Sequence, residues 1–258
     1  MRLHFRIYGE GPPLIILHGL LGSAENWHSI SRHRLASRLR VFALDLRNHG
    51  KSPHHERFDY PAMVEDLLEF YARHDLDSAC VLGHSMGGKA AMQLALSHTD
   101  RVDKLITVDI APKSYPPEHL HILEALQSLD LERYNARQEV DSALAERIRS
   151  RTVRQFLLKN LVRGQGLFRW QMDLENISRN YDALRAGLPE DGVFLGPALF
   201  IRGERSNYVQ EEDLDLIHRL FPNAELKTIP EAGHWVHADQ PEEFARAVIE
   251  FVQPHERR

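Results

Sequence analysis

The pentapeptide Gly83-His84-Ser85-Met86-Gly87 constrains the fold of this chain more than any other segment. An apolar run typical of a buried strand, Ala79–Leu82, precedes it, and a helix-forming run, Lys89–Ala95, follows it. Glycines two residues before and after the serine remove the side chains that would collide with the strand and the helix at a sharp turn. The pattern therefore predicts that Ser85 is a nucleophile held at the carboxyl end of a strand.

Apolar runs of strand length alternate with helical patterns along most of the 258 residues. Helical spacing is clearest in Tyr60–Asp75 and Glu242–Val252, and a further helix is expected within Trp27–Leu39. The alternation predicts an α/β fold, with a mostly parallel sheet that helices cover on both faces. The other predicted strands are Leu3–Tyr8, Leu14–Leu17, Val41–Leu44, Lys104–Val108, Ala198–Ile201 and Leu226–Ile229.

The stretch from about Pro112 to Pro189 breaks this alternation, because it offers helical patterns but no convincing strand. We interpret residues 112–189 as a helical cap inserted in a core that residues 1–111 and 190–258 form. Most apolar residues of the cap should pack against one another and the core, and a few should line an apolar pocket over Ser85. Gly164-Gln165-Gly166 is expected to be a mobile link.

Composition limits the classes of partner. The chain is 43% hydrophobic, enough for one substantial core, and its net charge of −5 comes from mixed charges without long runs of one sign. This argues against nucleic acid or an anionic membrane as the main partner and favours a small molecule. The single cysteine, Cys80, cannot form an internal disulfide. Because no signal peptide or membrane-length run is apparent, we expect a cytoplasmic protein, and its oligomeric state is left open.

A serine hydroxyl needs a base, and position favours His234 among the 16 histidines. Histidine suits the role because its unperturbed pKa of about 6.5 lies near neutral pH. His234 follows the last predicted strand and precedes the last helix, where the active sites of α/β folds assemble. His237 lies three residues further on, but no carboxylate motif accompanies the pair, so a metal site is not expected there.

Two acids are candidates for orienting His234. The usual position, in the loop after the penultimate strand, carries Ser206 in place of a carboxylate, with Glu204 nearby. Asp109 ends the strand that follows the Ser85 helix, and from there it can turn over the sheet edge toward His234. We therefore favour Asp109 as the residue that holds the imidazole in its working tautomer, with Glu204 as the alternative.

Acyl transfer also needs N–H donors for the oxyanion of the tetrahedral intermediate. One donor should be the amide of Met86, directly after the nucleophile, and the other the amide of Leu20 in the loop after the second predicted strand. Because both are backbone groups, their side chains can vary. His18 and Gly19 are expected to shape the loop, and His84 to pack beside the serine turn.

Five motifs together point to a known family: His18-Gly19, the run Asp45–Ser52, the run Gly83–Lys89, Asp109-Ile110-Ala111-Pro112 and the run Gly233–His237. The chain resembles the α/β-hydrolase superfamily throughout, apart from a divergent cap, and within it the small bacterial esterases of the YbfF type. The resemblance implies esterase activity on acyl esters or thioesters without a cofactor. It also supports Asp109, because the acid of that group follows the strand before the cap. Dehalogenases and epoxide hydrolases of similar shape carry an aspartate at the turn, so Ser85 indicates acyl transfer.

Three functions remain open at this point. Our first hypothesis is a carboxylic ester hydrolase that forms a serine acyl-enzyme from short-to-medium acyl esters. An acyl-CoA thioesterase would need basic residues for the nucleotide phosphates, and a ligand sensor with slow turnover would share the fold. The basic residues that the cap could supply are Arg149, Arg151, Arg154, Lys159 and Arg163.

Overall fold

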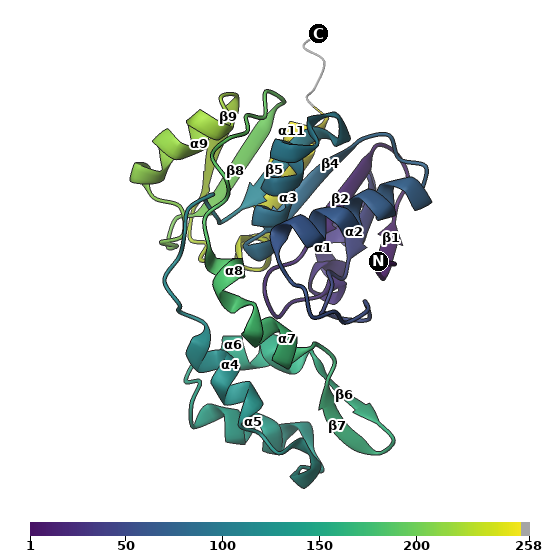
Figure 1. Ribbon diagram of the computed structural model, residues 1–258, viewed down its shortest axis with the longest axis vertical. Helices are drawn as coiled ribbons and strands as arrows, with labels where there is room; N and C mark the ends of the chain where they lie inside the picture. The colour runs from purple at the N-terminus through teal and green to yellow at the C-terminus, as the bar shows by residue number, and fades with distance from the viewer. Residues whose placement is uncertain (254–258) are drawn as a thin grey trace.

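The computed structural model describes residues 1–253, which fold around a seven-stranded sheet (Figure 1). Its strands lie in the order β1-β3-β2-β4-β5-β8-β9, and every neighbouring pair is parallel except β1 and β3. This architecture confirms the predicted α/β fold. The strands are β1 (Phe5–Tyr8), β2 (Pro13–Leu17), β3 (Arg40–Leu44), β4 (Ala79–His84), β5 (Val102–Val108), β8 (Ala198–Gly203) and β9 (Ala224–Ile229).

Alternate strand residues pack into two hydrophobic cores, one on each face of the sheet. In β2, Ile15 and Leu17 belong to one core, whereas Leu14 and Ile16 belong to the other. The near-continuous apolar runs of the sequence follow from this burial on both faces. Helices α2 (Tyr60–Arg73) and α3 (Met86–Ser97) supply the first core, and α11 (Pro241–Val252) supplies the second. The remaining core helices are α1 (His28–Ile30), α9 (Leu214–Leu220) and α10 (Val236–Asp239), with a π-helical turn at Ser31–Leu35.

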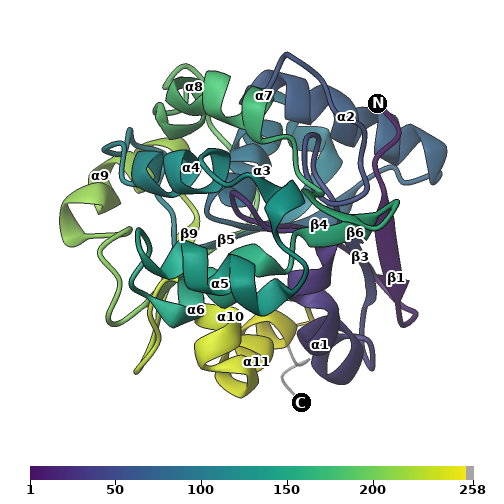
Figure 2. The ribbon, with the colours of Figure 1, turned by 90° about the horizontal axis from the view of Figure 1, so that it is seen from below.

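Residues 112–189, which we call the cap segment, leave the sheet after β5 and return before β8 (Figure 1). Seen from below, they lie in front of the sheet (Figure 2). The expectation of helices alone is wrong, because β6 and β7 form a hairpin. Gln165 and Gly166, both with positive φ, make its two-residue turn directly after Gly164. The elements are α4 (Leu120–Gln127), α5 (Arg137–Ala145), α6 (Arg151–Leu158), β6 (Leu161–Gly164), β7 (Leu167–Trp170), α7 (Leu174–Arg179) and α8 (Tyr181–Arg185).

Hydrogen bonds tie the cap segment to itself and to the core. Where its two ends pass each other, the amide of Tyr115 donates to the carbonyl of Arg185 at 2.9 Å. Further along, Nδ2 of the buried Asn160 donates to the carbonyl of Leu21 at 2.7 Å, in the loop after β2. The cap segment is therefore joined to the core at a loop that borders Ser85.

The carboxyl ends of the parallel strands lie at the sheet edge that the cap segment covers (Figure 1). Ser85 follows β4, Asp109 follows β5 and His234 follows β9, so the fold brings three distant parts of the sequence to one edge. Ligands of open α/β sheets bind at this edge. Within residues 1–253, no helix is both long and apolar enough to cross a membrane.

Candidate active site

Ser85 lies between β4 and α3 in a strained backbone conformation. Its φ of 52° and ψ of −119° lie outside the regions that L-residues ordinarily adopt. Two backbone hydrogen bonds hold the turn: the Ser85 amide donates to the carbonyl of Val108 at 3.0 Å, and the Lys89 amide donates to the carbonyl of Ser85 at 3.1 Å. The strand, turn and helix expected from the pentapeptide are present, and Ser85 is only partly buried.

The glycines on either side of Ser85 are required by close backbone approaches. A Cβ atom on Gly83 would lie 2.1 Å from the carbonyl oxygen of Gly87. A Cβ atom on Gly87 would lie 2.4 Å from the carbonyl oxygen of Leu17, in β2. A side chain at either position would push α3 away from the sheet and displace the serine.

His234 faces Asp109 across the sheet edge. Its Nδ1 donates to Oδ2 of Asp109 at 2.7 Å. The amide of Gly203 donates to Oδ1 of the same carboxylate at 3.1 Å, and the hydroxyl of Ser206 donates to Oδ2. Because Asp109 is fully buried, these donors fix the direction of its carboxylate. With Nδ1 donating, Nε2 of His234 is left as the basic nitrogen.

Of the two candidate acids, Asp109 is the one that contacts His234. Glu204 is exposed, and its Oε2 accepts a hydrogen bond from the amide of Glu231 at 2.9 Å. Ser206, which occupies the position where a carboxylate was expected, donates to Asp109 instead. The geometry therefore favours Asp109 over Glu204 as the orienting acid.

His84 supports the backbone of the loop that carries His234. Its Nε2 donates to the carbonyl of His234 at 2.9 Å, and the two ring centroids lie 4.7 Å apart. Burial lowers the pKa of His84 well below its ordinary value, so the ring is neutral and does not place a positive charge beside His234. This contact agrees with the expectation that His84 packs beside the serine turn.

The loop after β2 passes directly over Ser85. A Cβ atom on Gly19 would lie 3.3 Å from Cβ of Ser85, so the loop can approach this closely because residue 19 is glycine. Nδ1 of His18 donates to the carbonyl of Gly19 at 2.8 Å, and Nε2 of His49 accepts from the amide of Leu21 at 3.1 Å. Both imidazole rings are buried, so the hydrogen bonds with these two side chains fix the backbone of the loop.

Two backbone amides are available near Ser85. Within residues 1–253, the amides of Leu20 and Met86 donate to no backbone or side-chain acceptor. Leu20 and Met86 line the same cavity as Ser85. Preorganised N–H groups of this kind can stabilise the negative charge that develops on a carbonyl oxygen under attack.

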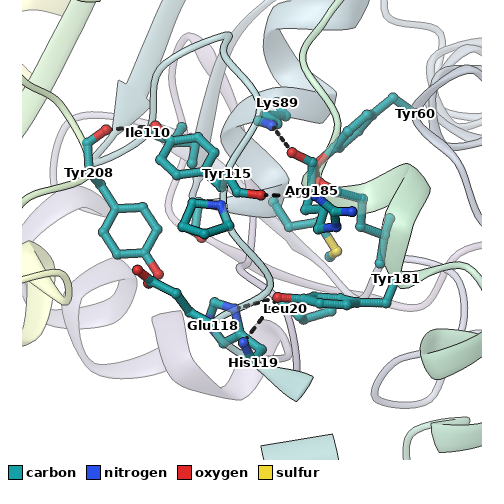
Figure 3. Close-up of a pocket in the computed structure, with 14 residues that line it drawn as sticks. Leu20, Tyr60, Lys89, Ile110, Tyr115, Glu118, His119, Tyr181, Arg185 and Tyr208 are labelled. Atoms are coloured by element: carbon teal, nitrogen blue, oxygen red, sulfur yellow. Dashed lines mark hydrogen bonds between the residues drawn. The ribbon is translucent and has the colours of Figure 1, made fainter. Parts of the chain in front are cut away.

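The cavity at Ser85 encloses about 450 Å³ of space that atoms do not fill, part of it open to solvent. Core and cap residues line it together, and most carry apolar or aromatic side chains (Figure 3). Tyr208 stacks on His234, with ring centroids 3.9 Å apart and planes at 22°. The lining residues are Leu20, Tyr60, Ser85, Met86, Lys89, Ile110, Tyr115, Pro116, Glu118, His119, Tyr181, Leu184, Arg185 and Tyr208.

Tyr208, His119 and Tyr181 also line the cavity, although no sequence pattern assigns them a role. Tyr181 accepts a hydrogen bond at its hydroxyl from the amide of His119 at 3.0 Å. Burial lowers the pKa of His119 to about 4, so this ring is neutral near pH 7. The three residues come from separate segments, and no motif marks them; only their proximity to the predicted serine in three dimensions reveals them.

A second cavity lies on the other side of the loop after β2, between α6 and α10. It encloses about 1150 Å³, including open solvent, and reaches Gly19 and His84. Phe156 and Trp235 form an aromatic wall, with ring centroids 5.5 Å apart. Within residues 1–253, no group of three or more metal-binding side chains lies close enough to hold a metal ion.

The five basic residues of the cap segment that the sequence suggested for nucleotide phosphates do not share one environment. Arg151 and Lys159 are exposed and line the second cavity. Arg154 instead donates to Asp141 at 2.7 Å, and the guanidinium of Arg163 lies 4.6 Å from the ring centroid of Phe168. The remaining one, Arg149, is exposed and does not line either cavity.

Known proteins are similar to this chain along nearly its whole length. The profile of the alpha/beta hydrolase fold family matches residues 12–241. The sn-1-specific diacylglycerol lipase ABHD11 of Danio rerio is 40% identical, over 95% of this chain and 80% of that protein. Esterase YbfF of Escherichia coli is 35% identical, over 93% of this chain and 92% of that protein.

A solved structure gives the same result. The structure described as a marine microorganism esterase is 44% identical and superposes with a TM-score of 0.94, over 96% of this chain and 98% of that one. Its coverage includes the cap segment as well as the sheet, because the two chains match almost end to end. The family profile, the two relatives and this structure show that the chain belongs to the α/β-hydrolase fold family.

Proposed function

We propose that this protein hydrolyses carboxylic esters through an acyl-enzyme on Ser85. Oγ of Ser85 attacks the ester carbonyl carbon while Nε2 of His234 takes the hydroxyl proton. His234 then returns that proton to the alcohol oxygen as its bond to the carbonyl carbon breaks. Water attacks the acyl-enzyme by the same route and releases the acid. Asp109 orients His234 throughout, and the amides of Leu20 and Met86 donate to the oxyanion in both steps.

The observation that carries this proposal is the hydrogen bond between His234 and the buried Asp109 at the sheet edge where the strained Ser85 turn lies. The esterase and lipase names of the similar proteins also support ester substrates. We propose that residues 112–189 act as the cap and that the cavity at Ser85, lined mostly by apolar and aromatic side chains, takes a short-to-medium acyl group. A cytoplasmic location is proposed from the sequence alone.

Initial rates on p-nitrophenyl esters from acetyl to palmitoyl test the proposal. The expected result is turnover that peaks at a short or medium chain and falls by about 10⁴ to 10⁶-fold in Ser85→Ala. Circular dichroism of Ser85→Ala checks that the variant is folded. Hydrolysis that survives in Ser85→Ala would refute the serine mechanism, and the absence of turnover on every ester would favour a slow ligand sensor.

One observation favours acyl-CoA thioesters as a second candidate. Arg151 and Lys159 line the second cavity, where they could contact the phosphates of a nucleotide leaving group. Inhibition of ester hydrolysis by free coenzyme A, but not by pantetheine, which has the same thiol and no phosphates, would support this assignment. The double variant Arg151→Gln/Lys159→Gln should then weaken the inhibition, whereas Arg149→Gln, an exposed cation outside both cavities, is the matched control.

A further inference from the structure

Lys89 is a buried cation in the wall of the cavity that holds the nucleophile. It lies on α3 directly after the Ser85 turn, and 1% of its surface is exposed. Its Nζ donates to the carbonyls of Arg185 and Ala186, at 3.3 and 2.5 Å. Figure 3 shows the amine beside the Arg185 carbonyl, with the rings of Tyr60 and Tyr115 on either side. The distances from Nζ to these ring centroids are 5.9 and 4.9 Å.

Within residues 1–253, Lys89 has no carboxylate within ion-pair distance. The two other charged residues of the cavity wall do not supply one. Arg185 is a cation and is already paired with Asp182, at 2.7 Å. Glu118 is exposed to solvent and lies beside the hydroxyl of Tyr208, away from Lys89 (Figure 3). The ammonium group is therefore held by neutral oxygens and aromatic faces alone.

This environment leaves the charge of Lys89 incompletely compensated. An ammonium group has three N–H donors, and two carbonyls accept from it here. Burying a cation without an opposite charge is costly, and burial accordingly lowers the pKa of Lys89 to about 7. A bound anion in the cavity would supply both the missing acceptor and the missing charge.

We propose that Lys89 binds a carboxylate at the far end of the acyl group, so that the enzyme prefers esters of dicarboxylic acids. The inference rests on the proposed ester hydrolysis at Ser85, and it names the substrate class of that site. Lys89 is four residues beyond Ser85, and one helical turn advances about 5.4 Å along the axis. Ser85 and Lys89 line the same cavity about one helical turn apart, so the monoester of a dicarboxylic acid of moderate length is the substrate to test.

A pair of esters that differ only at the far end tests the proposal. We would compare kcat/KM for p-nitrophenyl monoadipate and p-nitrophenyl hexanoate, with Ser85→Ala supplying the rate of uncatalysed hydrolysis. The expected wild-type preference for the monoadipate is at least about tenfold, the effect of one charge-assisted hydrogen bond. Lys89→Met, which is unbranched and of similar length, should abolish this preference.

Lys104→Met is the matched control. Nζ of Lys104 also donates to two carbonyls at a helix end, those of Phe251 and Val252 at 2.8 and 3.1 Å, but Lys104 does not line the cavity. The preference for the monoadipate should survive in this variant. If Lys89→Met lowers kcat/KM for both esters by the same factor, Lys89 serves only to fasten the cap segment and the proposal is overturned. A wild-type enzyme that hydrolyses the hexanoate without preferring the monoadipate overturns it too, yet leaves the proposed ester hydrolysis intact.

Adipate itself provides a readout that does not depend on turnover. It should inhibit hydrolysis of the hexanoate competitively, with an inhibition constant that rises at least about tenfold in Lys89→Met. The inhibition should also weaken from pH 6 to pH 9 as the amine loses its proton. Tyr60 and Tyr115 do not interfere, because burial raises the pKa of both phenols, and Arg185 keeps its charge. Inhibition that is independent of both pH and Lys89 would overturn the assignment.

Discussion

Acidification should destabilise this protein, because several buried histidines are neutral in the folded state. Burial lowers the pKa of His49 and His237 to about 3 and that of His119 to about 4. In the unfolded chain each would titrate near 6.5. Their contribution to stability is complete above pH 6.5 and is lost as the pH falls below it, because the unfolded state then binds more protons than the folded state.

The magnitude follows from these values. At pH 5.5, each of these three histidines carries a proton in about ten of every eleven unfolded chains. This protonation stabilises the unfolded state by a little over 1 kcal/mol per histidine. The three histidines together therefore remove about 4 kcal/mol of unfolding free energy between pH 7.5 and pH 5.5. The pKa values of His18 and His84 are also lowered by burial, so both act in the same direction. A domain of ordinary stability, about 5–15 kcal/mol, would lose a large share of it.

Urea unfolding at the two pH values measures this loss directly, provided that the unfolding free energy depends on urea concentration with the same slope at both. His237→Phe is an informative variant, because the His237 ring stacks on Trp27 at 4.1 Å and its Nδ1 has no hydrogen-bond partner within the described residues. The variant keeps an aromatic ring but cannot bind a proton. Its unfolding free energy should therefore fall by about 1 kcal/mol less than that of the wild type between pH 7.5 and pH 5.5. A wild-type unfolding free energy that changes by less than about 1 kcal/mol between the two pH values would refute the reasoning.

Three further predictions concern the site. Asp109→Asn should lower kcat by about 10⁴, whereas Glu204→Gln, the matched control at the other candidate acid, should leave the rate within about twofold; the reverse result would move the role to Glu204. Gly83→Ala should destabilise the fold by several degrees in Tm or prevent soluble expression, because its Cβ would lie 2.1 Å from the carbonyl of Gly87. Tyr208→Ala should lower kcat by up to about tenfold, the value of an aromatic contact with His234, and Tyr208→Phe should restore most of it; equal rates in both variants would show that the stacked ring is unimportant.

Sequence patterns predicted the features that depend on local geometry. The turn at Ser85 needs glycine at fixed positions, because backbone groups approach those positions closely, so its spacing is visible in the sequence. The parallel strands are buried on both faces and therefore appear as continuous apolar runs. The hairpin in the cap segment was missed for the opposite reason. Its strands have four residues each and are mostly not buried, so neither carries a strong apolar pattern.

The choice of acid shows why the rest of the site needed the structure. In the sequence, Asp109 and Glu204 both follow predicted strands, and the spacing does not say which carboxylate reaches His234. In the fold, β5 and β8 are neighbours, so Asp109 enters the same space as the loop after β8. Gly203 at the end of β8 and Ser206 in the loop after it donate to Asp109, which places its carboxylate against His234. The loop that usually carries the acid thus donates hydrogen bonds to a carboxylate that follows the neighbouring strand, as favoured from the sequence. The Ser206 hydroxyl donates to Asp109. A carboxylate at position 206 would instead repel the Asp109 carboxylate, which explains why this position carries a serine.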